Sequence, residues 1–260
     1  MDLKSIKDPS ILKTMSYKEL KALALEIRSF LIEQIPKTGG HLSSNLGTIE
    51  LIIALHYVFD SPNDAFIFDV GHQAYTHKIL TGRMDQFDTL RQTNGLSGYI
   101  SYHESEHDQW ESGHAGTAIS ALMGFLYANK LSQKERQGIA IVGDASMTNG
   151  MSFEALNLLG NTNDVKGIII LNDNEMSISK SVGSITKALT RFRSMRFFIK
   201  LKRFWQMVLP EFMLRFLGRI KRGLRGLLQR QNIFEDLGYM YIGPLDGHDI
   251  KGLIYNLKRI

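Results

Sequence analysis

The sequence predicts an α/β fold, specifically a three-layer, doubly wound parallel sheet, from two observations. Short apolar runs alternate along the chain with helix-like stretches, and each run ends in a polar turn. Continuous apolar runs are typical of strands buried on both faces, as in parallel sheets covered by helices. The runs predicted as strands are Ala65 to Val70, Gly138 to Val142 and Gly167 to Leu171.

Local signals predict the first two helices. Ser16 and Glu19 have the spacing of a capping box, and apolar residues then recur at helical spacing up to a stop at Pro36. A second helix is predicted at residues 49–59. The stretch between the two helices, residues 38–47, is rich in glycine and polar side chains, so we expect it to be a loop outside the core.

Further helices are expected between and after the strands, since parallel strands need crossover connections. They are predicted at residues 73–80, from the Gly113-His114 turn to about 130, at 151–159 and at the end of the chain, where the last helix follows a short strand and turn at 239–248. In such a sheet, ligands bind beyond the carboxyl ends of the strands.

The basic charge of the sequence is confined to one insert. The formal net charge of the 260 residues is +5, but residues 187–230 contain thirteen Lys and Arg against one acid, so the rest carries −7. We therefore expect one acidic domain over residues 1–260 with a basic, flexible insert at about 184–231. The length and the 43% of hydrophobic residues allow a sizeable core and exclude overall disorder.

Three interpretations of this insert stay open. Its interleaved aromatic, aliphatic and cationic residues are typical of an interfacial amphipathic helix that contacts an anionic membrane. The same composition is compatible with a surface that docks an acidic partner, or with a solvated lid. We expect no binding to nucleic acid, because no helix-turn-helix, zinc-finger or RNA-binding motif is present.

The absence of cysteine limits the chemistry that is possible. It excludes disulfides, a cysteine nucleophile, thiolate zinc sites and iron–sulfur clusters, so any metal must be bound by oxygen or imidazole. The N-terminal residues form no signal-peptide pattern, and no run of about 18 apolar residues occurs. We expect a soluble, cytoplasmic protein.

Two strand ends carry side chains that suit a divalent cation. Gly143-Asp144 ends one predicted strand and Asn172-Asp173-Asn174 ends the next, so Asp144 and Asn174 are expected side by side at one sheet edge. Carboxylate and amide oxygens bind Mg²⁺ when a diphosphate supplies further oxygens, and helix N-termini add N–H groups. The same residues are also compatible with an ordinary helix cap and turn, and spacing alone leaves both interpretations open.

Four motifs, in this order, resemble those of the 1-deoxy-D-xylulose-5-phosphate synthases, a family of transketolase-like thiamine-diphosphate enzymes. The motifs are GGHLSSNLG at 39–47, DVGHQAY with HKILTGR at 69–83, LNDNEMSIS at 171–179 and YIGPLDGHD at 241–249. The resemblance runs from residue 1 to 260 and is weakest across the insert. It implies the thiamine-diphosphate-binding, transketolase-like fold for the whole chain.

The resemblance implies thiamine diphosphate and Mg²⁺ as cofactors and assigns site residues to them. The implied metal ligands are Asp144, Asn174 and the backbone carbonyl of Met176. The implied cofactor-binding residues are His72, Gly113, His114, Ala115, Asp144, Ala145, Ser146, Asn174 and Met176. The implied catalytic residues are His41, His72 and His248, because imidazoles bind carboxylate or phosphate groups and shuttle protons near neutral pH. We expect His56, His77, His103 and His107 to be structural.

This sequence departs from the family's motifs at two turns. The usual Gly-Asp-Gly here reads Gly143-Asp144-Ala145, which adds one methyl group near the diphosphate. The usual Gly-His-Ser-Ser here ends in Ala115 and Gly116, which removes two hydroxyl groups. Each lost hydrogen bond is worth about 1 kcal/mol net, so we expect weaker or altered cofactor binding.

The resemblance leaves three functional hypotheses. The first is the diphosphate-binding part of an enzyme that condenses pyruvate, with decarboxylation, and glyceraldehyde 3-phosphate, for isoprenoid, thiamine and pyridoxal precursor synthesis. The family's cofactor-activating glutamate belongs to a pyrimidine-binding domain that is absent here, so we expect a fragment or a subunit, in a homodimer or hetero-oligomer. The alternatives are a split transketolase-like subunit with other substrates and a non-catalytic remnant that acts as a binding module.

Overall fold

The computed structural model describes residues 3–173 and 233–260. The chain divides into a larger unit, residues 1–178 with 245–260, and a smaller one, residues 179–244. In the smaller unit, α9 (Ile233–Asp236) brings the Phe234 ring to 5.9 Å from that of Tyr241, in a stacked arrangement. Asn174, Met176 and the predicted insert at 184–231 lie outside the described residues.

Three parallel strands form the sheet of the larger unit, in the order β1 (Ala65–Phe68), β2 (Gly138–Gly143) and β3 (Ile168–Asn172). Phe68 pairs with Ile141 and Gly143 pairs with Asn172, so the carboxyl ends of all three strands lie at one edge. The predicted parallel sheet is therefore confirmed. β3 is half-buried along its whole length, whereas β1 is fully buried.

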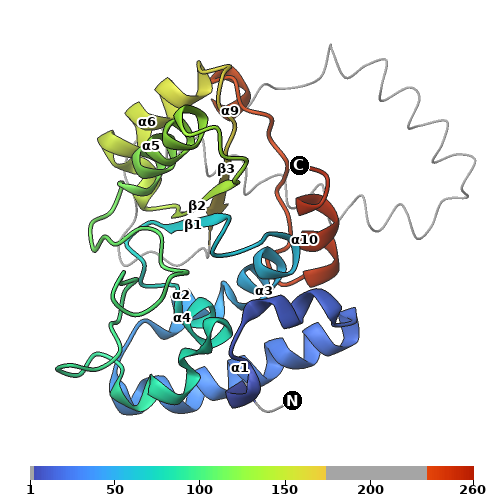
Figure 1. Ribbon diagram of the computed structural model, residues 1–260, viewed down its shortest axis with the longest axis vertical. Coiled ribbons are helices and arrows are strands. Elements are labelled where there is room, and N and C mark those ends of the chain that lie inside the picture. The colour runs from blue at the N-terminus through green and yellow to red at the C-terminus, as the bar shows by residue number, and fades with distance from the viewer. Residues whose placement is uncertain (1–2, 174–232) are drawn as a thin grey trace, which may run out of the picture. The chain divides into compact units, whose positions relative to one another are not determined.

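Helices cover both faces of this sheet (Figure 1). One face packs under α5 (Ala118–Leu131) and α6 (Gly150–Gly160), where a Cβ on Gly138 would come within 2.6 Å of the Leu122 side chain. Phe66, Phe68, Ile139 and Ile141 belong instead to the large core formed with the helices of the other face. Because neighbouring residues of a strand point to opposite faces, both faces need apolar residues, and this explains the continuous apolar runs.

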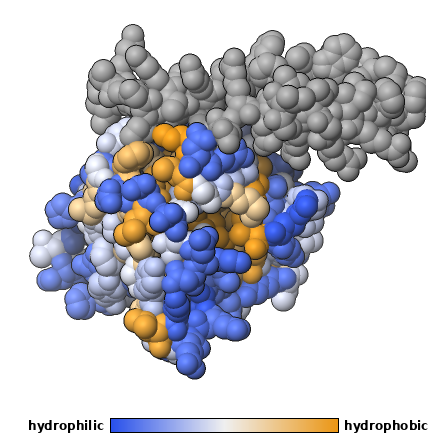
Figure 2. Space-filling view, turned by 90° about the horizontal axis from the view of Figure 1, so that it is seen from above, coloured by the Kyte–Doolittle hydropathy of each residue, from blue (hydrophilic) through white to orange (hydrophobic). Residues whose placement is uncertain are grey.

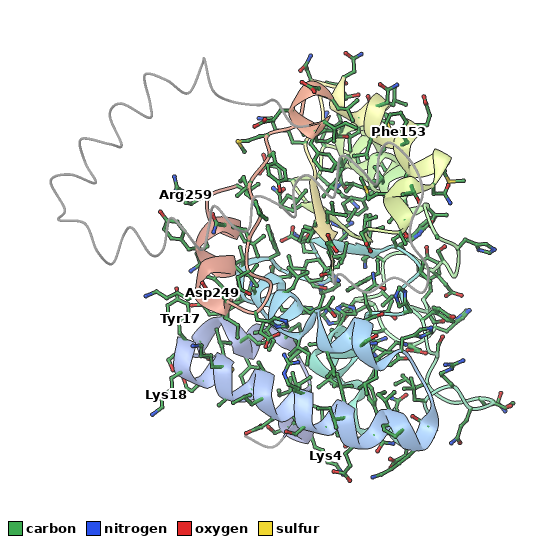
Figure 3. The ribbon with its side chains drawn as sticks, turned by 180° about the vertical axis from the view of Figure 1, so that it is seen from behind. Lys4, Tyr17, Lys18, Phe153, Asp249 and Arg259 are labelled. Carbon is green, nitrogen blue, oxygen red and sulfur yellow. The ribbon has the colours of Figure 1, made fainter. Side chains whose placement is uncertain are left out.

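The other layer is built around α3 (Ile49–Val58), which is buried along most of its length between α1 (Tyr17–Thr38) and α10 (Ile250–Leu257). In Figure 3, Tyr17 at the start of α1 lies beside Asp249, the residue before α10, and the Lys251 ammonium is 6.0 Å from the Tyr17 ring centroid. The shorter segments are α2 (Leu42–Leu46), α4 (Tyr75–Lys78), the 3₁₀ turns Leu3–Ser5, Pro9–Thr14, Met84–Thr89 and Ser146–Thr148, and the π-type turn Ile79–Arg83.

Several predicted boundaries need correction. The capping box at Ser16 and Glu19 is present, but α1 passes through Pro36 and ends at Thr38, because a proline in the last turn interrupts few backbone hydrogen bonds. The predicted loop at 38–47 contains the helix α2 and the fully buried Asn45. The strand predicted within residues 239–248 is wrong, since these residues form irregular backbone and a turn.

Apolar side chains also reach the surface. Seen from above, patches of apolar side chains lie between polar ones (Figure 2). The exposed large apolar residues of α6 are Met151, Phe153 and Leu158, of which Phe153 is labelled in Figure 3. None of the helices in residues 3–173 and 233–260 has both the length and the hydrophobicity needed to span a membrane.

Candidate active site

The chain turns sharply where β1 ends, and this turn directs His72. Val70 and Gly71 have φ values of +63° and +89°, in the left-handed region. A Cβ on Gly71 would come within 3.1 Å of the Ile100 backbone nitrogen, so a glycine is needed both for the conformation and for the close approach. The DVGH motif is thus a tight turn at the carboxyl edge of the sheet.

The structure brings His41 and His72 together. Their ring centroids are 5.1 Å apart in an edge-to-face arrangement, and the Tyr99 ring lies 6.1 Å from that of His41. The Nδ1 atoms of both histidines are buried and have no hydrogen-bond partner among the described residues. Burial lowers the pKa of both imidazoles, with smaller contributions from Arg91 for His41 and from His41 for His72. Two neutral imidazoles with unused polar atoms therefore face each other.

Asn45 holds these two histidines in place, a role that sequence reasoning missed. Its side chain is fully buried, and its Nδ2 donates to the backbone carbonyls of His41 (2.7 Å) and His72 (2.8 Å). Its Oδ1 accepts the backbone N–H of Tyr75 at 2.8 Å. Asn45 therefore joins the two histidine-bearing motifs, and only its position within the first motif could have suggested this.

His248 is held by a different partner. Its Nδ1 lies 3.0 Å from Oε2 of Glu50, in the first turn of α3, and Oε1 of Glu50 accepts from Arg28 at 2.7 Å. Its backbone N–H donates to Oδ1 of Asp246 at 3.0 Å. The His248 side chain is 59% exposed, whereas that of Glu50 is 11% exposed. A largely buried carboxylate therefore holds an imidazole that stays accessible to solvent.

The turn after β2 contains three of the predicted cofactor residues. Asp144 is half-buried and donates its backbone N–H to the Asn172 carbonyl at 3.2 Å, so the ends of β2 and β3 adjoin as predicted. Ala145 has φ −63° and ψ −38°, an ordinary helical conformation, so its methyl group causes no backbone strain. Ser146 is buried. Asn174 and Met176 are not described, and the complete metal ligand set stays a prediction.

Asp69, directly after β1, fixes the turn that contains Gly113, His114 and Ala115. Its buried carboxylate accepts the backbone N–H of Gly116 at 3.0 Å and that of Ala118 at 3.1 Å. These N–H groups lie at the start of α5, where a carboxylate is favoured by the helix dipole. Gly113, His114 and Ala115 themselves are exposed. From the sequence, Asp69 was expected only as a residue of the predicted strand and of the DVGHQAY motif, with no role for its side chain.

Three of the four histidines expected to be structural lie in a buried polar network. Nε2 of His56 is 2.9 Å from Nδ1 of His77, whose Nε2 is 3.2 Å from Asp108. Both terminal nitrogens of Arg83 bind the Asp108 carboxylate at 2.7 and 2.9 Å. The other members are Lys78 and Glu104, which form an ion pair, and His107, which contacts Ser61. His103, by contrast, is exposed.

This network fixes the segment that contains Tyr99. Glu104 accepts the backbone N–H of Ser97 at 2.6 Å, and Asp108 accepts that of Ser101 at 3.1 Å.

Burial lowers the pKa of His77 to about 4. Burial alone would raise the pKa of Asp108, but hydrogen bonds from His77 and Arg83 outweigh it and hold that pKa well below its usual range.

The fold is that of a transketolase-like α/β protein. Transketolase from Leishmania mexicana matches 93% of this chain and 35% of its own with a TM-score of 0.65 and 16% identity. Transketolase from Campylobacter jejuni matches 94% of this chain and 36% of its own, with a TM-score of 0.63 and 19% identity.

Sequence comparison then identifies the family. The family model for 1-deoxy-D-xylulose-5-phosphate synthase matches residues 3–260. The synthases of Paraburkholderia xenovorans and Halalkalibacterium halodurans are each 48% identical over 99% of this chain, which covers 41% and 42% of their lengths. This chain belongs to the 1-deoxy-D-xylulose-5-phosphate synthase family, and it spans about two fifths of the length of these relatives.

Proposed function

We propose that this chain is the diphosphate-binding part of a 1-deoxy-D-xylulose-5-phosphate synthase. The reaction joins the two carbons left after decarboxylation of pyruvate to glyceraldehyde 3-phosphate. The observation that carries the proposal is the pair of neutral imidazoles, His41 and His72, whose buried Nδ1 atoms lack partners in the described part of the chain. Unpartnered buried polar atoms at the carboxyl edge of a parallel sheet are typical of a ligand site.

The residues at this edge suit thiamine diphosphate and Mg²⁺. Asp144, with Asn174 and the Met176 carbonyl, would bind Mg²⁺ through hard oxygen atoms. Ala145 and Ser146 would line the diphosphate, and the conformation of Ala145 accommodates its methyl group. The turn at Gly113, His114 and Ala115 would line the cofactor channel. When bound, thiamine diphosphate supplies the electron sink that lets a carbonyl carbon act as a nucleophile.

The histidines would supply binding and proton control. His72, neutral because of its burial, would contact the cofactor. His41 would face the substrates, where a neutral imidazole can donate one hydrogen bond and accept another. Glu50 would orient His248 by accepting its Nδ1–H. Nε2 would then accept a hydrogen bond from a substrate hydroxyl group, or donate to a phosphate oxygen when the imidazole is protonated.

Residues 1–260 would form one diphosphate-side domain, with the insert at about 184–231 as a lid or docking surface. The cofactor-activating glutamate would come from a pyrimidine-binding domain or subunit, in a homodimer or hetero-oligomer. The length of the relatives supports a requirement for this second component. The cytoplasm, with pyruvate and glyceraldehyde 3-phosphate at hand, is the proposed setting.

Calorimetric titration with thiamine diphosphate and Mg²⁺ tests the proposal, on the chain alone and mixed with the pyrimidine-binding region of a 48% identical relative. We expect binding in at least the mixture, and Asp144→Ala to weaken it by more than roughly 10-fold, as losses in a metal site do. Asp164→Ala, which removes an exposed partner of Lys130, is the matched control. Absence of binding in both settings would refute the proposal.

A second assay tests the reaction. The mixture should consume pyruvate only when glyceraldehyde 3-phosphate is present, and His41→Ala should abolish most of this activity. His103→Ala, at an exposed histidine, should leave it unchanged. Activity with another acceptor but not with glyceraldehyde 3-phosphate would show a different transketolase-like enzyme.

A further inference from the structure

The Asn149 side chain fills the space into which a side chain at position 116 would project. Gly116 has φ +90°, and a Cβ built on it would lie 2.6 Å from Cγ and 2.8 Å from Nδ2 of Asn149. Side-chain carbon atoms in proteins do not approach this closely. A residue larger than glycine at position 116 therefore requires Asn149 to move, and Asn149 in its observed position requires glycine.

The Asn149 amide joins two turns. Its Oδ1 accepts the backbone N–H of Met151 at 3.1 Å and so caps α6. Its Nδ2 donates to the backbone carbonyl of Ala115 at 3.0 Å. Ala115 belongs to the turn before α5, and Asn149 follows the turn that contains Asp144. These are the two turns to which the proposed function assigns the cofactor.

Asp69 and Asn149 therefore hold the turn before α5 from two sides, in addition to the hydroxyl groups of Ser112 and Thr117, which contact the His114 backbone. Asp69 accepts the N–H of Gly116, while Asn149 donates to the carbonyl of Ala115. The family's motif has serines where this chain has Ala115 and Gly116. We propose that Asn149 is a positioning residue that replaces those hydroxyls. It holds the turn at residues 113–115, which would line the cofactor channel, to the turn that contains Asp144, and Gly116 leaves the space that its side chain needs. This inference rests on the proposed function.

The proposal differs from a simple capping role, and one substitution separates the two. In Asn149→Ser, the hydroxyl oxygen can still cap α6, but the shorter side chain cannot reach the Ala115 carbonyl. Asn149→Ala removes both interactions. Asn161→Ser, at the other end of α6, is the matched control because it changes the same residue type at an exposed position away from both turns.

The experiment measures the melting temperature without cofactor and the affinity for thiamine diphosphate with Mg²⁺, by calorimetry, on the full chain with its pyrimidine-binding partner. We expect Asn149→Ser to melt close to wild type but to bind the cofactor about 3- to 10-fold more weakly, the loss of one net hydrogen bond. Asn149→Ala should lower both quantities, and Asn161→Ser neither. Wild-type affinity in Asn149→Ser would overturn the positioning role.

A double-mutant cycle without cofactor tests the coupling independently. Gly116→Ser should lower the melting temperature strongly, and less so when Asn149→Ala has removed the amide that it would strike. Part of the cost should remain, because serine is disfavoured at φ +90°. Strictly additive effects would overturn the coupling. If no variant, wild type included, binds cofactor, the proposed function and the cofactor role fail together, while the cycle still decides whether the two residues act as a unit.

Discussion

Nδ1 of His248 and Oε2 of Glu50 are 3.0 Å apart, although 198 positions separate the two residues in the sequence. Glu50 is in the first turn of α3, and His248 comes shortly before α10. The pair therefore depends on the packing of α10 against α3. Arg28, on the other side of Glu50, donates to Oε1 at 2.7 Å and so orients this carboxylate.

Glu50→Gln should reduce the orientation of His248 without preventing cofactor binding. A glutamine amide has one acceptor oxygen and an NH2 donor, so it cannot accept from Arg28 and from His248 through two separate oxygens as the carboxylate does. We expect the KM for the phosphorylated substrate to rise about 3- to 10-fold, the range for one lost charge-assisted hydrogen bond, with less change in kcat. Nitrogen chemical shifts of the imidazole should show loss of the single Nδ1–H tautomer. Glu33→Gln, in an exposed pair with Lys37, is the control; an unchanged tautomer in Glu50→Gln would contradict the assignment.

Stability should fall as the pH falls from about 6.5 to 4. Burial lowers the pKa of His56 and of His77, the latter to about 4, so the unfolded chain binds protons in this range that the folded chain excludes. Each such histidine steepens the pH dependence by about 1.4 kcal/mol per pH unit, and at pH 4 His77 alone costs about 3 kcal/mol. Urea unfolding at several pH values measures the slope.

His77→Gln should reduce that slope by about one proton's contribution, because glutamine can replace both hydrogen bonds without titrating. His103→Gln, at an exposed histidine, should leave the slope as in wild type. An equal slope in wild type and His77→Gln would show that His77 is already protonated in the folded protein.

The buried ion pairs should contribute far more to stability than those at the surface. Asp108→Asn removes one of the two carboxylates that pair with the Arg83 guanidinium, which is only 3% exposed and keeps Glu104 as its other partner. We expect a loss of about 3 kcal/mol in the free energy of unfolding, the lower end of the range for a broken buried ion pair. Asp164→Asn breaks a solvent-exposed pair with Lys130 and should change stability far less, because water screens the interaction. Similar losses in the two variants, measured by urea unfolding, would exclude a structural role for the network.

Two glycine-to-alanine substitutions should act in opposite directions. Gly82 has φ +86°, and its Cβ would lie 2.7 Å from the backbone oxygen of Lys7, so we expect Gly82→Ala to destabilise the fold by about 1–3 kcal/mol. Gly124 is inside α5 with open space around its Cβ position, so Gly124→Ala should stabilise by about 0.5–1 kcal/mol. Thermal unfolding gives both values; a lower melting temperature in Gly124→Ala would show that α5 does not tolerate the added methyl group.

The sequence predicted correctly those helices and strands whose physical cause is local. The structure confirms the capping box at Ser16 and Glu19, the helical spacing of α1 and the apolar runs of β1 and β2. Each of these features involves residues that lie within a few positions of one another. The strand predicted within 239–248 was wrong because a few aromatic and aliphatic residues do not determine a strand without a partner.

The sequence by itself determined the α/β class, the family and the motifs that contain His41, His72, Asp144 and His248. Only the tertiary structure decided what holds them: Asn45 between the two histidines, Asp69 and Asn149 on either side of one turn, and Glu50 under His248. The physical reason is that these hydrogen bonds join residues 27 to 198 positions apart, so no local period or propensity encodes them. The tertiary structure also showed why Gly116 is glycine, since its partner Asn149 lies on another element.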